Sequence, residues 1–390
     1  MQGNAQDLKI AELWRSAAGF GGPVFAAIIL ASLIFCFALF ALRADKIFAL
    51  PGAISQASAE DLVAFWRASS MALSGEAAAA YDRLVFQAPL AAPNDNLIWW
   101  NPPHAFLMIW PLALLPYGAA KLLWLGASIA ALAWIVRLAQ PTPFKLVAIL
   151  LSPAAFASLL VLQTGPFFAL GLLTAFLMAD RRPLLSGLLL AVLTVKPQYG
   201  LMAPIFLAAI GAWRAFGAAV IFTLALSFMS AMIFGVEVWR QFFAVPVADY
   251  AAAGLHRDMV SISHSLQKAG LSQSVALTMH VGVATAAAGL VWVAARRAPR
   301  DAAIGLALLA SALAAPVIWI YDWPLVAAGI FMLTRSASPM PISIQIIMGL
   351  AWLGPLYSLG FGTMASSLAA PALLALLAAG AGWRIVSSSP

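Results

Sequence analysis

The chain has 390 residues, of which 64% are hydrophobic and only 9% are charged. A water-soluble domain of this length has about 25% charged residues, so the composition excludes an ordinary water-facing surface. The net charge of +7 comes from Lys and Arg residues scattered singly or in small groups between apolar stretches, which indicates topology determinants rather than a nucleic-acid-binding patch. Because Cys36 is the single cysteine, the sequence excludes a disulfide framework and a cysteine-based metal site.

Apolar stretches of about 15–22 residues recur from Val24 to Trp383, and each is long enough to approach the thickness of a hydrocarbon layer. The first stretch, 23–42, exceeds the core of a typical signal peptide, so we expect a retained span. Further spans are expected near 119–137, 146–162, 166–179, 184–196, 199–213, 216–234, 274–295, 302–319, 323–334, 342–358 and 364–383. The sequence therefore predicts an all-α polytopic membrane protein of about 12 transmembrane helices, folded as one integral-membrane domain over residues 1–390.

Basic residues occur in alternate connections between the predicted spans. These connections contain Arg137 and Lys145, Arg181 and Arg182, Arg214, Arg296, Arg297 and Arg300, Arg335, and Arg384. The positive-inside rule places them in the cytoplasm of a cell whose inner (plasma) membrane holds the spans. Two long segments, 43–116 and 235–273, are then extracytoplasmic loops, and 105–112 is expected to be an interfacial helix because it is short and broken by proline.

Asp61 opens the segment Asp-Leu-Val-Ala-Phe-Trp-Arg-Ala, soon after the first span. Ser58 stands three residues earlier, so 58–73 is predicted to begin a capped amphipathic helix on the membrane surface. A partly desolvated carboxylate in that position is well placed to accept a proton from a hydroxyl group. The alternative is an acid that only complements the dipole of its helix.

Polar residues also fall at the outer ends of later spans. Lys196, in Val-Lys-Pro-Gln, is a candidate for binding a lipid phosphate, or a lysine that simply extends to the interface. Gln163, in Leu-Gln-Thr-Gly-Pro-Phe, is a candidate for binding a sugar or phosphate oxygen, or only a turn residue. Tyr321 and Asp322 lie between two tryptophans, and an acid so close to the bilayer needs a partner such as Lys196 or Arg257, in a functional or a structural ion pair.

The two long loops add histidine and arginine candidates. His256 and Arg257 are suited to binding an anionic head group or stabilising a leaving phosphate, and His104, in Asn-Pro-Pro-His, is a similar candidate in the first loop. A solvated loop is the alternative for all three residues. The spacing of the four histidines matches no zinc pattern, so no metal is expected.

An ordered set of motifs resembles glycosyltransferase family 87, whose members are polyprenyl-phosphate-dependent membrane enzymes of the GT-C type. The motifs are the Asp61 segment with Leu73, Gly75 and Tyr81-Asp82, then Pro111–Pro116 with Leu123-Trp124, Gln163-Thr-Gly-Pro-Phe, Asp180–Gly187, Lys196-Pro-Gln and Tyr321-Asp322-Trp-Pro-Leu. They cover about residues 55–335 of the chain. The family usually places glycine before the turn glutamine and asparagine after it, whereas this chain has Leu162 and Thr164.

The resemblance implies a GT-C fold with interfacial helices in the first outer loop. It implies transfer of a sugar, most often mannose, from a polyprenyl-phosphate donor to a lipid or cell-envelope glycan on the extracytoplasmic face, with inversion. It also implies that Asp61 is the general base and that Lys196 contacts the donor phosphate. Because the leaving polyprenyl phosphate already carries its negative charge, a cationic side chain can stabilise it, and no cofactor is expected.

Two other functions stay open on the sequence. A transporter or flippase of polyprenyl-linked glycans would perform no chemistry, but the spans contain few mid-membrane charges and no matched pair of broken helices. A non-catalytic scaffold for envelope-polysaccharide assembly is the third interpretation. The sequence also leaves the donor sugar open between mannose and arabinofuranose.

Overall fold

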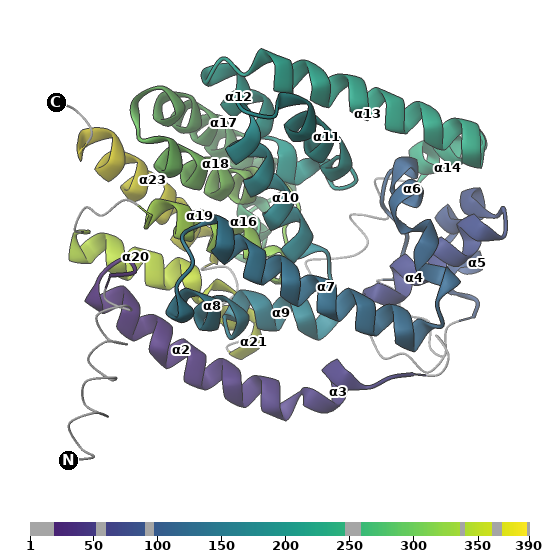
Figure 1. Cartoon of the computed structure of the whole chain (residues 1–390), viewed down its shortest axis with the longest axis horizontal. Helices are drawn as coiled ribbons and strands as arrows, with labels where there is room; N and C mark the ends of the chain where they lie inside the picture. Colours follow the sequence, from purple (N-terminus) through teal and green to yellow (C-terminus); the bar gives the residue numbers. More distant parts are fainter. Residues whose placement is uncertain are drawn as a thin grey trace.

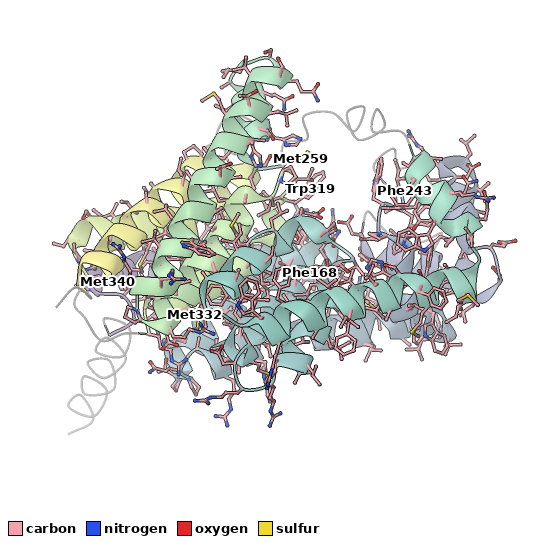
Figure 2. The ribbon with its side chains drawn as sticks, turned by 90° about the horizontal axis from the view of Figure 1, so that it is seen from above. Phe168, Phe243, Met259, Trp319, Met332 and Met340 are labelled. Atoms are coloured by element: carbon pink, nitrogen blue, oxygen red, sulfur yellow. The ribbon has the colours of Figure 1, made fainter. Side chains whose placement is uncertain are left out.

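The computed structural model describes residues 19–51, 60–89, 97–245, 259–335, 340–360 and 369–387. Throughout these ranges the regular elements are helices, and the β-type pairing is an isolated bridge between Met259 and Trp319, which lie side by side in Figure 2. The prediction of an all-α protein is therefore confirmed for the part of the chain described here.

Four of the described helices are long and apolar enough to cross a membrane. They are α2 (Pro23–Leu42), α7 (Tyr117–Leu138), α13 (Trp213–Phe234) and α17 (Gln273–Arg297). The bent pair α8 (Pro143–Leu150) and α9 (Pro153–Val161), whose axes differ by 46°, makes a fifth span if it is counted as one. On α13 the side chain of Phe228 is 67% exposed, which is favourable when the surrounding solvent is lipid. The chain is a multi-pass membrane protein.

The remaining predicted spans are also helical but shorter. These are α10 (Gly165–Met178), α11 (Pro183–Leu193), α12 (Ala203–Ala209), α18 (Arg300–Ala314), α19 (Pro324–Leu333), α20 (Ile342–Trp352), α21 (Gly354–Gly360) and α23 (Ala369–Ser387). A helix of ten residues rises only about 15 Å, half of a hydrocarbon layer. The figure of 12 transmembrane helices and the GT-C topology therefore stay predictions.

Proline and glycine in the sequence determine where several of these helices begin and how closely they pack. Proline occupies the first turn of α2, α8, α9, α10, α11 and α19, where its missing N–H needs no partner.

Residues 302–314 of α18 are all buried. Gly305 of α18 lies against Gly329 of α19, where a side chain on either residue would press on the other helix, so these two helices form a tightly packed centre.

The first long loop folds into short helices between α2 and α7. They are α3 (Ala44–Phe48), α4 (Leu62–Leu73), η2 (Ala77–Tyr81), α5 (Arg83–Gln87), η3 (Pro103–Ala105), α6 (Phe106–Ile109) and η4 (Trp110–Leu114). In Figure 1, α4, α5 and α6 gather at one end of the molecule with α14 (Glu237–Ala244), far from α20 and α23. The predicted helix over 58–73 begins at Leu62, and Ser58 lies outside the described residues.

The connections between helices meet at two opposite ends, as the charge alternation predicts. At one end, the Ser158 hydroxyl near the end of α9 donates to the Tyr321 carbonyl between α18 and α19, at 2.7 Å. At the other end, Arg300, the first residue of α18, pairs with Asp180 in the α10–α11 turn, at 2.7 Å. The first end therefore gathers the polar motifs and the second end gathers the basic connections.

Candidate functional site

Asp61 is the residue before α4, but its carboxylate makes no capping hydrogen bond to that helix. Its backbone N–H donates to the Val161 carbonyl at 2.9 Å, and its Oδ2 atom accepts a hydrogen bond from Gln163 Nε2 at 2.8 Å. The acid is thus tied to the α9–α10 turn, a hundred residues further along the chain. The alternative role for Asp61, an acid that only complements the dipole of α4, therefore does not fit this geometry.

The surroundings of Asp61 favour its protonated form. Burial raises the pKa of Asp61 from 3.8 to about 6, and the neighbouring charge of Asp322 adds to the rise. The hydrogen bond from Gln163 and the positive charge of Lys196 act in the opposite direction and limit it. A carboxyl with a pKa near 6 is a stronger base than an ordinary aspartate and is still mostly ionised at neutral pH.

Gln163 stands in the α9–α10 turn with both ends of its amide occupied. Its Oε1 atom accepts hydrogen bonds from the Thr164 N–H at 2.9 Å and from Lys196 Nζ at 3.2 Å, while Nε2 donates to Asp61. Helix α9 ends because Leu162 takes a left-handed conformation, with φ 54°. Glycine adopts this conformation without strain, whereas leucine seldom does, so Leu162 is an uncommon residue at such a helix end.

Gly165 lets this turn approach the α18–α19 connection. A side chain at Gly165 would overlap the carbonyl oxygen of Tyr321, and Pro166 then starts α10. The Ser158 hydroxyl donates to the same carbonyl. The Gln-Thr-Gly-Pro sequence therefore places the α9–α10 turn against Tyr321 and Asp322 as well as beside Asp61.

Lys196 follows α11, and Pro197 begins the short helix η5 (Pro197–Gly200) directly after it. Its side chain is 13% exposed, and its Nζ lies 3.7 Å from Asp322 Oδ1. Three aromatic rings surround the ammonium group, with centroids 5.7–5.9 Å from Nζ: Phe168, Tyr199 and Tyr321. The lysine therefore points into the protein among aromatic rings, and the alternative of a lysine extending to the interface does not fit the structure.

Asp322 lies in η6 (Ile320–Asp322) and is 2% exposed. Its Oδ2 atom accepts hydrogen bonds from the Tyr199 hydroxyl and, at 3.2 Å, from the Trp319 N–H. Lys196 is the ionic partner expected for this acid. The neighbouring rings of Trp319 and Tyr321 stack with centroids 5.6 Å apart and form an aromatic wall beside the ion pair.

His104 is placed near this cluster without joining it. Its Nε2 atom lies 3.0 Å from the hydroxyl of Thr194, two residues before Lys196, and its ring stacks on Trp239 at 6.2 Å. Burial lowers the pKa of His104 to about 4, although the bond to Thr194 opposes the change. A neutral, 3% exposed imidazole is suited to supporting the Lys196 segment rather than to binding an anion as a cation.

The two other predicted site residues, His256 and Arg257, lie outside the described residues. The structure thus brings together Asp61, Gln163, Lys196, Tyr321 and Asp322 from four separate parts of the sequence. Within the described ranges, no three His, Cys, Asp or Glu side chains are arranged to hold a metal ion. Independence of a metal stays a prediction.

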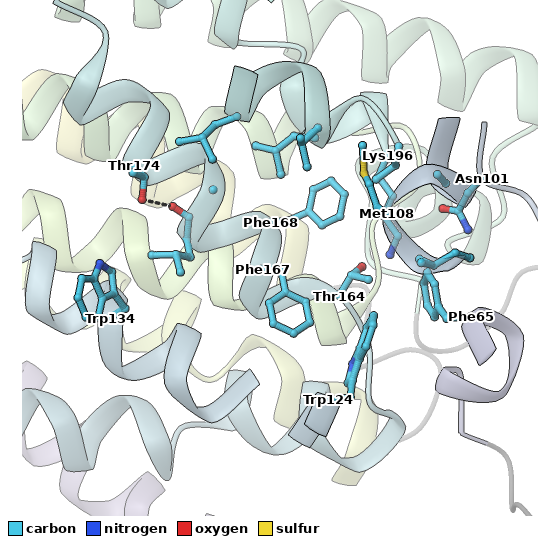
Figure 3. Close-up of a pocket in the computed structure, with 18 residues that line it drawn as sticks. Phe65, Asn101, Met108, Trp124, Trp134, Thr164, Phe167, Phe168, Thr174 and Lys196 are labelled. Carbon is cyan, nitrogen blue, oxygen red and sulfur yellow. Dashed lines mark hydrogen bonds between the residues drawn. The ribbon is translucent and has the colours of Figure 1, made fainter. Parts of the chain in front are cut away.

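A cavity of about 510 Å³ extends from Lys196 between α7, α10, α11 and the first-loop helices (Figure 3). Polar side chains occur toward the Lys196 end, where Thr164 and Asn101 line it. The remainder of the lining is almost entirely apolar: Phe65, Ala105, Met108, Ile109, Trp124, Trp134, Phe167, Phe168, Leu170, Gly171, Thr174, Leu189, Val192, Leu193 and Val195. Among these residues, the hydroxyl of Thr174 donates to the Leu170 carbonyl at 2.7 Å.

Sequence reasoning missed a buried polar group directly beside the site. Glu60 precedes Asp61 and accepts from Lys121 Nζ at 2.5 Å and from the Tyr117 hydroxyl at 2.6 Å, both on α7. A lysine near the start of an apolar span was the available signal, since such a residue needs a partner. Tyr199, which bonds Asp322, was also missed, although it stands three residues after Lys196.

The amino-acid sequence matches the family model of glycosyltransferase family 87 over residues 99–319, which is more than half of the chain. Searches of curated proteins and of solved structures gave no match. The matched range includes Gln163 and Lys196 but begins after Asp61, so the role of that acid does not follow from the match. The resemblance inferred from the ordered motifs is confirmed, and the chain belongs to glycosyltransferase family 87, a membership that indicates glycosyltransferase activity.

Proposed function

We propose that the protein transfers a sugar, mannose in the first instance, from a polyprenyl-phosphate donor to a hydroxyl of a lipid or cell-envelope glycan. One observation carries the proposal: Lys196 lines the apolar cavity and also bonds Gln163, which in turn bonds Asp61. A single cation thus stands between a space suited to a hydrocarbon chain and a carboxylate suited to accepting a proton. These are the two parts that a lipid-phosphate sugar donor requires.

The cavity suits, in chemistry and in size, the part of the donor's prenyl chain that lies next to the phosphate. Its volume of about 510 Å³ lies within the usual range for small-molecule sites, about 300–1,000 Å³. Along α10 its lining extends from Thr164 to Thr174, a rise of about 15 Å. With the prenyl chain in this cavity, the phosphate lies at Lys196 and the sugar extends toward Asp61 and the Trp319–Tyr321 wall.

The proposed reaction is one displacement at the anomeric carbon. The acceptor hydroxyl forms the new bond to that carbon as its proton passes to Asp61, and the bond from the carbon to the phosphate oxygen breaks with its electron pair leaving on the phosphate. Lys196 stabilises the negative charge that develops on the leaving polyprenyl phosphate. Attack from the face opposite the phosphate inverts the anomeric configuration.

Asp322 and Tyr199 hold Lys196 in place for this role. The ammonium group has one carboxylate at 3.7 Å and three aromatic rings around it, and these contacts fix its position at the cavity. No nucleotide is needed because the donor phosphate is already charged. The positive-inside rule favours an extracytoplasmic site in the plasma membrane, because the basic connections lie at the opposite end of the helices.

The test is transfer of radiolabelled mannose from synthetic polyprenyl-phosphate mannose to a membrane lipid extract by purified protein. Asp61→Asn is expected to lower the turnover about 10²–10⁴-fold while donor binding is retained, since only the base is lost. Lys196→Met is expected to weaken donor binding as well as turnover. Matched controls are Asp45→Asn and Lys46→Met, exposed charges on α3 whose loss is expected to leave turnover unchanged.

Each outcome has a distinct meaning. Full activity of Asp61→Asn would show that another group is the base. Transfer only from a polyprenyl-phosphate arabinofuranose donor would retain the enzyme and replace the sugar. Movement of an intact polyprenyl-linked glycan across vesicles without transfer would support the transporter alternative, which family membership already disfavours.

A further inference from the structure

A second cavity, of about 690 Å³, lies between the starts of α11 and α13. Its lining consists of Arg182, Pro183, Leu184, Leu185, Trp213, Arg214, Gly217, Ala218 and Ile221, and we call it the α11–α13 groove. Helix α11 starts at Pro183 and ends before Lys196, so the groove and the candidate site lie at opposite ends of one helix, about 16 Å apart along its axis. The groove is therefore separate from the proposed donor cavity.

Small residues form the floor of this groove. A side chain at Gly187 would overlap Ala218, which lines the groove, so α11 and α13 are in direct contact at its base. At Gly217 a Cβ atom would have no neighbour within 4 Å, because the groove opens above that residue. The walls are large apolar side chains that face outward, with Leu184 67%, Ile221 66% and Trp213 63% exposed.

The two arginines at the mouth of the groove carry uncompensated charge. Arg182 and Arg214 are both exposed, and within the described residues neither side chain has a hydrogen bond or an ion pair. Two other arginines at this end of the bundle are neutralised: Arg300 pairs with Asp180, and Arg335 pairs with Asp301. Among the residues that the structure describes, no acidic side chain lines the groove.

We propose that the α11–α13 groove binds one anionic phospholipid of the leaflet that faces the basic end of the bundle. The guanidinium groups of Arg182 and Arg214 hold the lipid phosphate, because planar donor pairs match phosphate oxygens. The acyl chains lie along Leu184, Leu185 and Ile221, and the indole of Trp213 stands at the head-group level, where tryptophan is favoured. Basic pockets between transmembrane helices are typical sites for anionic head groups.

Native mass spectrometry of the full chain, released from detergent with added lipid, tests this proposal. The probes are phosphatidylglycerol and phosphatidylcholine with identical acyl chains. We expect one phosphatidylglycerol to be retained at least about tenfold more tightly than phosphatidylcholine. Arg182→Gln/Arg214→Gln is expected to abolish that preference, whereas Arg137→Gln/Arg181→Gln removes the same charge from exposed arginines outside the groove and is expected to retain it.

A steric variant separates the groove from simple surface charge. Gly217→Phe fills the groove while keeping both arginines, and it is expected to lose the bound lipid. Equal retention of the two lipids, loss of phosphatidylglycerol in the Arg137→Gln/Arg181→Gln control, or unchanged binding by Gly217→Phe would each overturn the proposal. Displacement of phosphatidylglycerol by millimolar inorganic phosphate would also overturn it, since the occupant would then be a free anion.

Discussion

Gln163 donates a hydrogen bond from its Nε2 atom to Asp61 Oδ2 at 2.8 Å, although 102 positions separate the two residues in the chain. The orientation of this amide is fixed because its oxygen accepts from the Thr164 N–H and from Lys196. The amide nitrogen of Gln163 thus faces Asp61, and the amide oxygen faces Lys196. The glutamine therefore bridges the proposed base and the proposed phosphate-binding lysine.

The pH dependence of transfer is expected to report the ionisation of Asp61. A general base acts in its ionised form, so kcat/KM is low below the pKa of Asp61 and rises as the pH increases through it. With that pKa raised to about 6, the acid limb is expected to have its midpoint near pH 6, well above an ordinary aspartate. Initial rates of sugar transfer between pH 4.5 and 8 measure it, and a midpoint near pH 4 contradicts the assignment.

Replacing Gln163 by methionine is expected to move this acid limb to higher pH. The amide stabilises the ionised carboxylate of Asp61, so its loss raises the pKa of that acid further. Transfer at pH 7 then falls, and part of the loss is recovered at pH 8.5. A uniform loss of rate at all pH values would instead indicate that Gln163 contacts substrate or only maintains the fold.

The Glu60–Lys121 ion pair is expected to support the fold next to Asp61. Both side chains are buried, with exposures of 4% and 1%, so Lys121→Met leaves an uncompensated carboxylate in the interior. The expected cost is about 3–5 kcal/mol of stability, visible as a lower thermal midpoint in detergent. The double variant Glu60→Gln/Lys121→Met removes both charges and is expected to regain most of the loss; equal midpoints for the single and double variants contradict a buried pair.

Gly165→Ala is expected to damage the site through its backbone. The added methyl group would overlap the carbonyl oxygen of Tyr321, which belongs to the main chain and cannot rotate away. The α9–α10 turn must therefore move, with an expected cost of about 1–3 kcal/mol and a loss of transfer activity. Gly126→Ala on α7 is the matched control, because its Cβ meets nothing within 4 Å and alanine favours a helix.

Several properties of this protein followed from its sequence alone. Hydropathy predicted α2, α7, α13 and α17 to within a few residues, because a segment exposed to lipid has to satisfy its backbone internally and show an apolar surface. The alternation of basic connections predicted which turns share an end of the bundle. The ordered motifs predicted the family, and they marked Asp61, Gln163, Lys196 and Asp322 as residues of interest.

The tertiary structure decided what the sequence left open. Whether Lys196 extends to the interface or turns inward depends on the aromatic rings and the carboxylate that other helices bring to it. The Glu60–Lys121 pair and the contact of Gly165 with Tyr321 join residues far apart in the chain, and no local pattern encodes such contacts. The sequence alone could not show which apolar segments are shorter helices buried in the core. In a membrane protein both the core and the lipid-facing surface are apolar, so only packing distinguishes them.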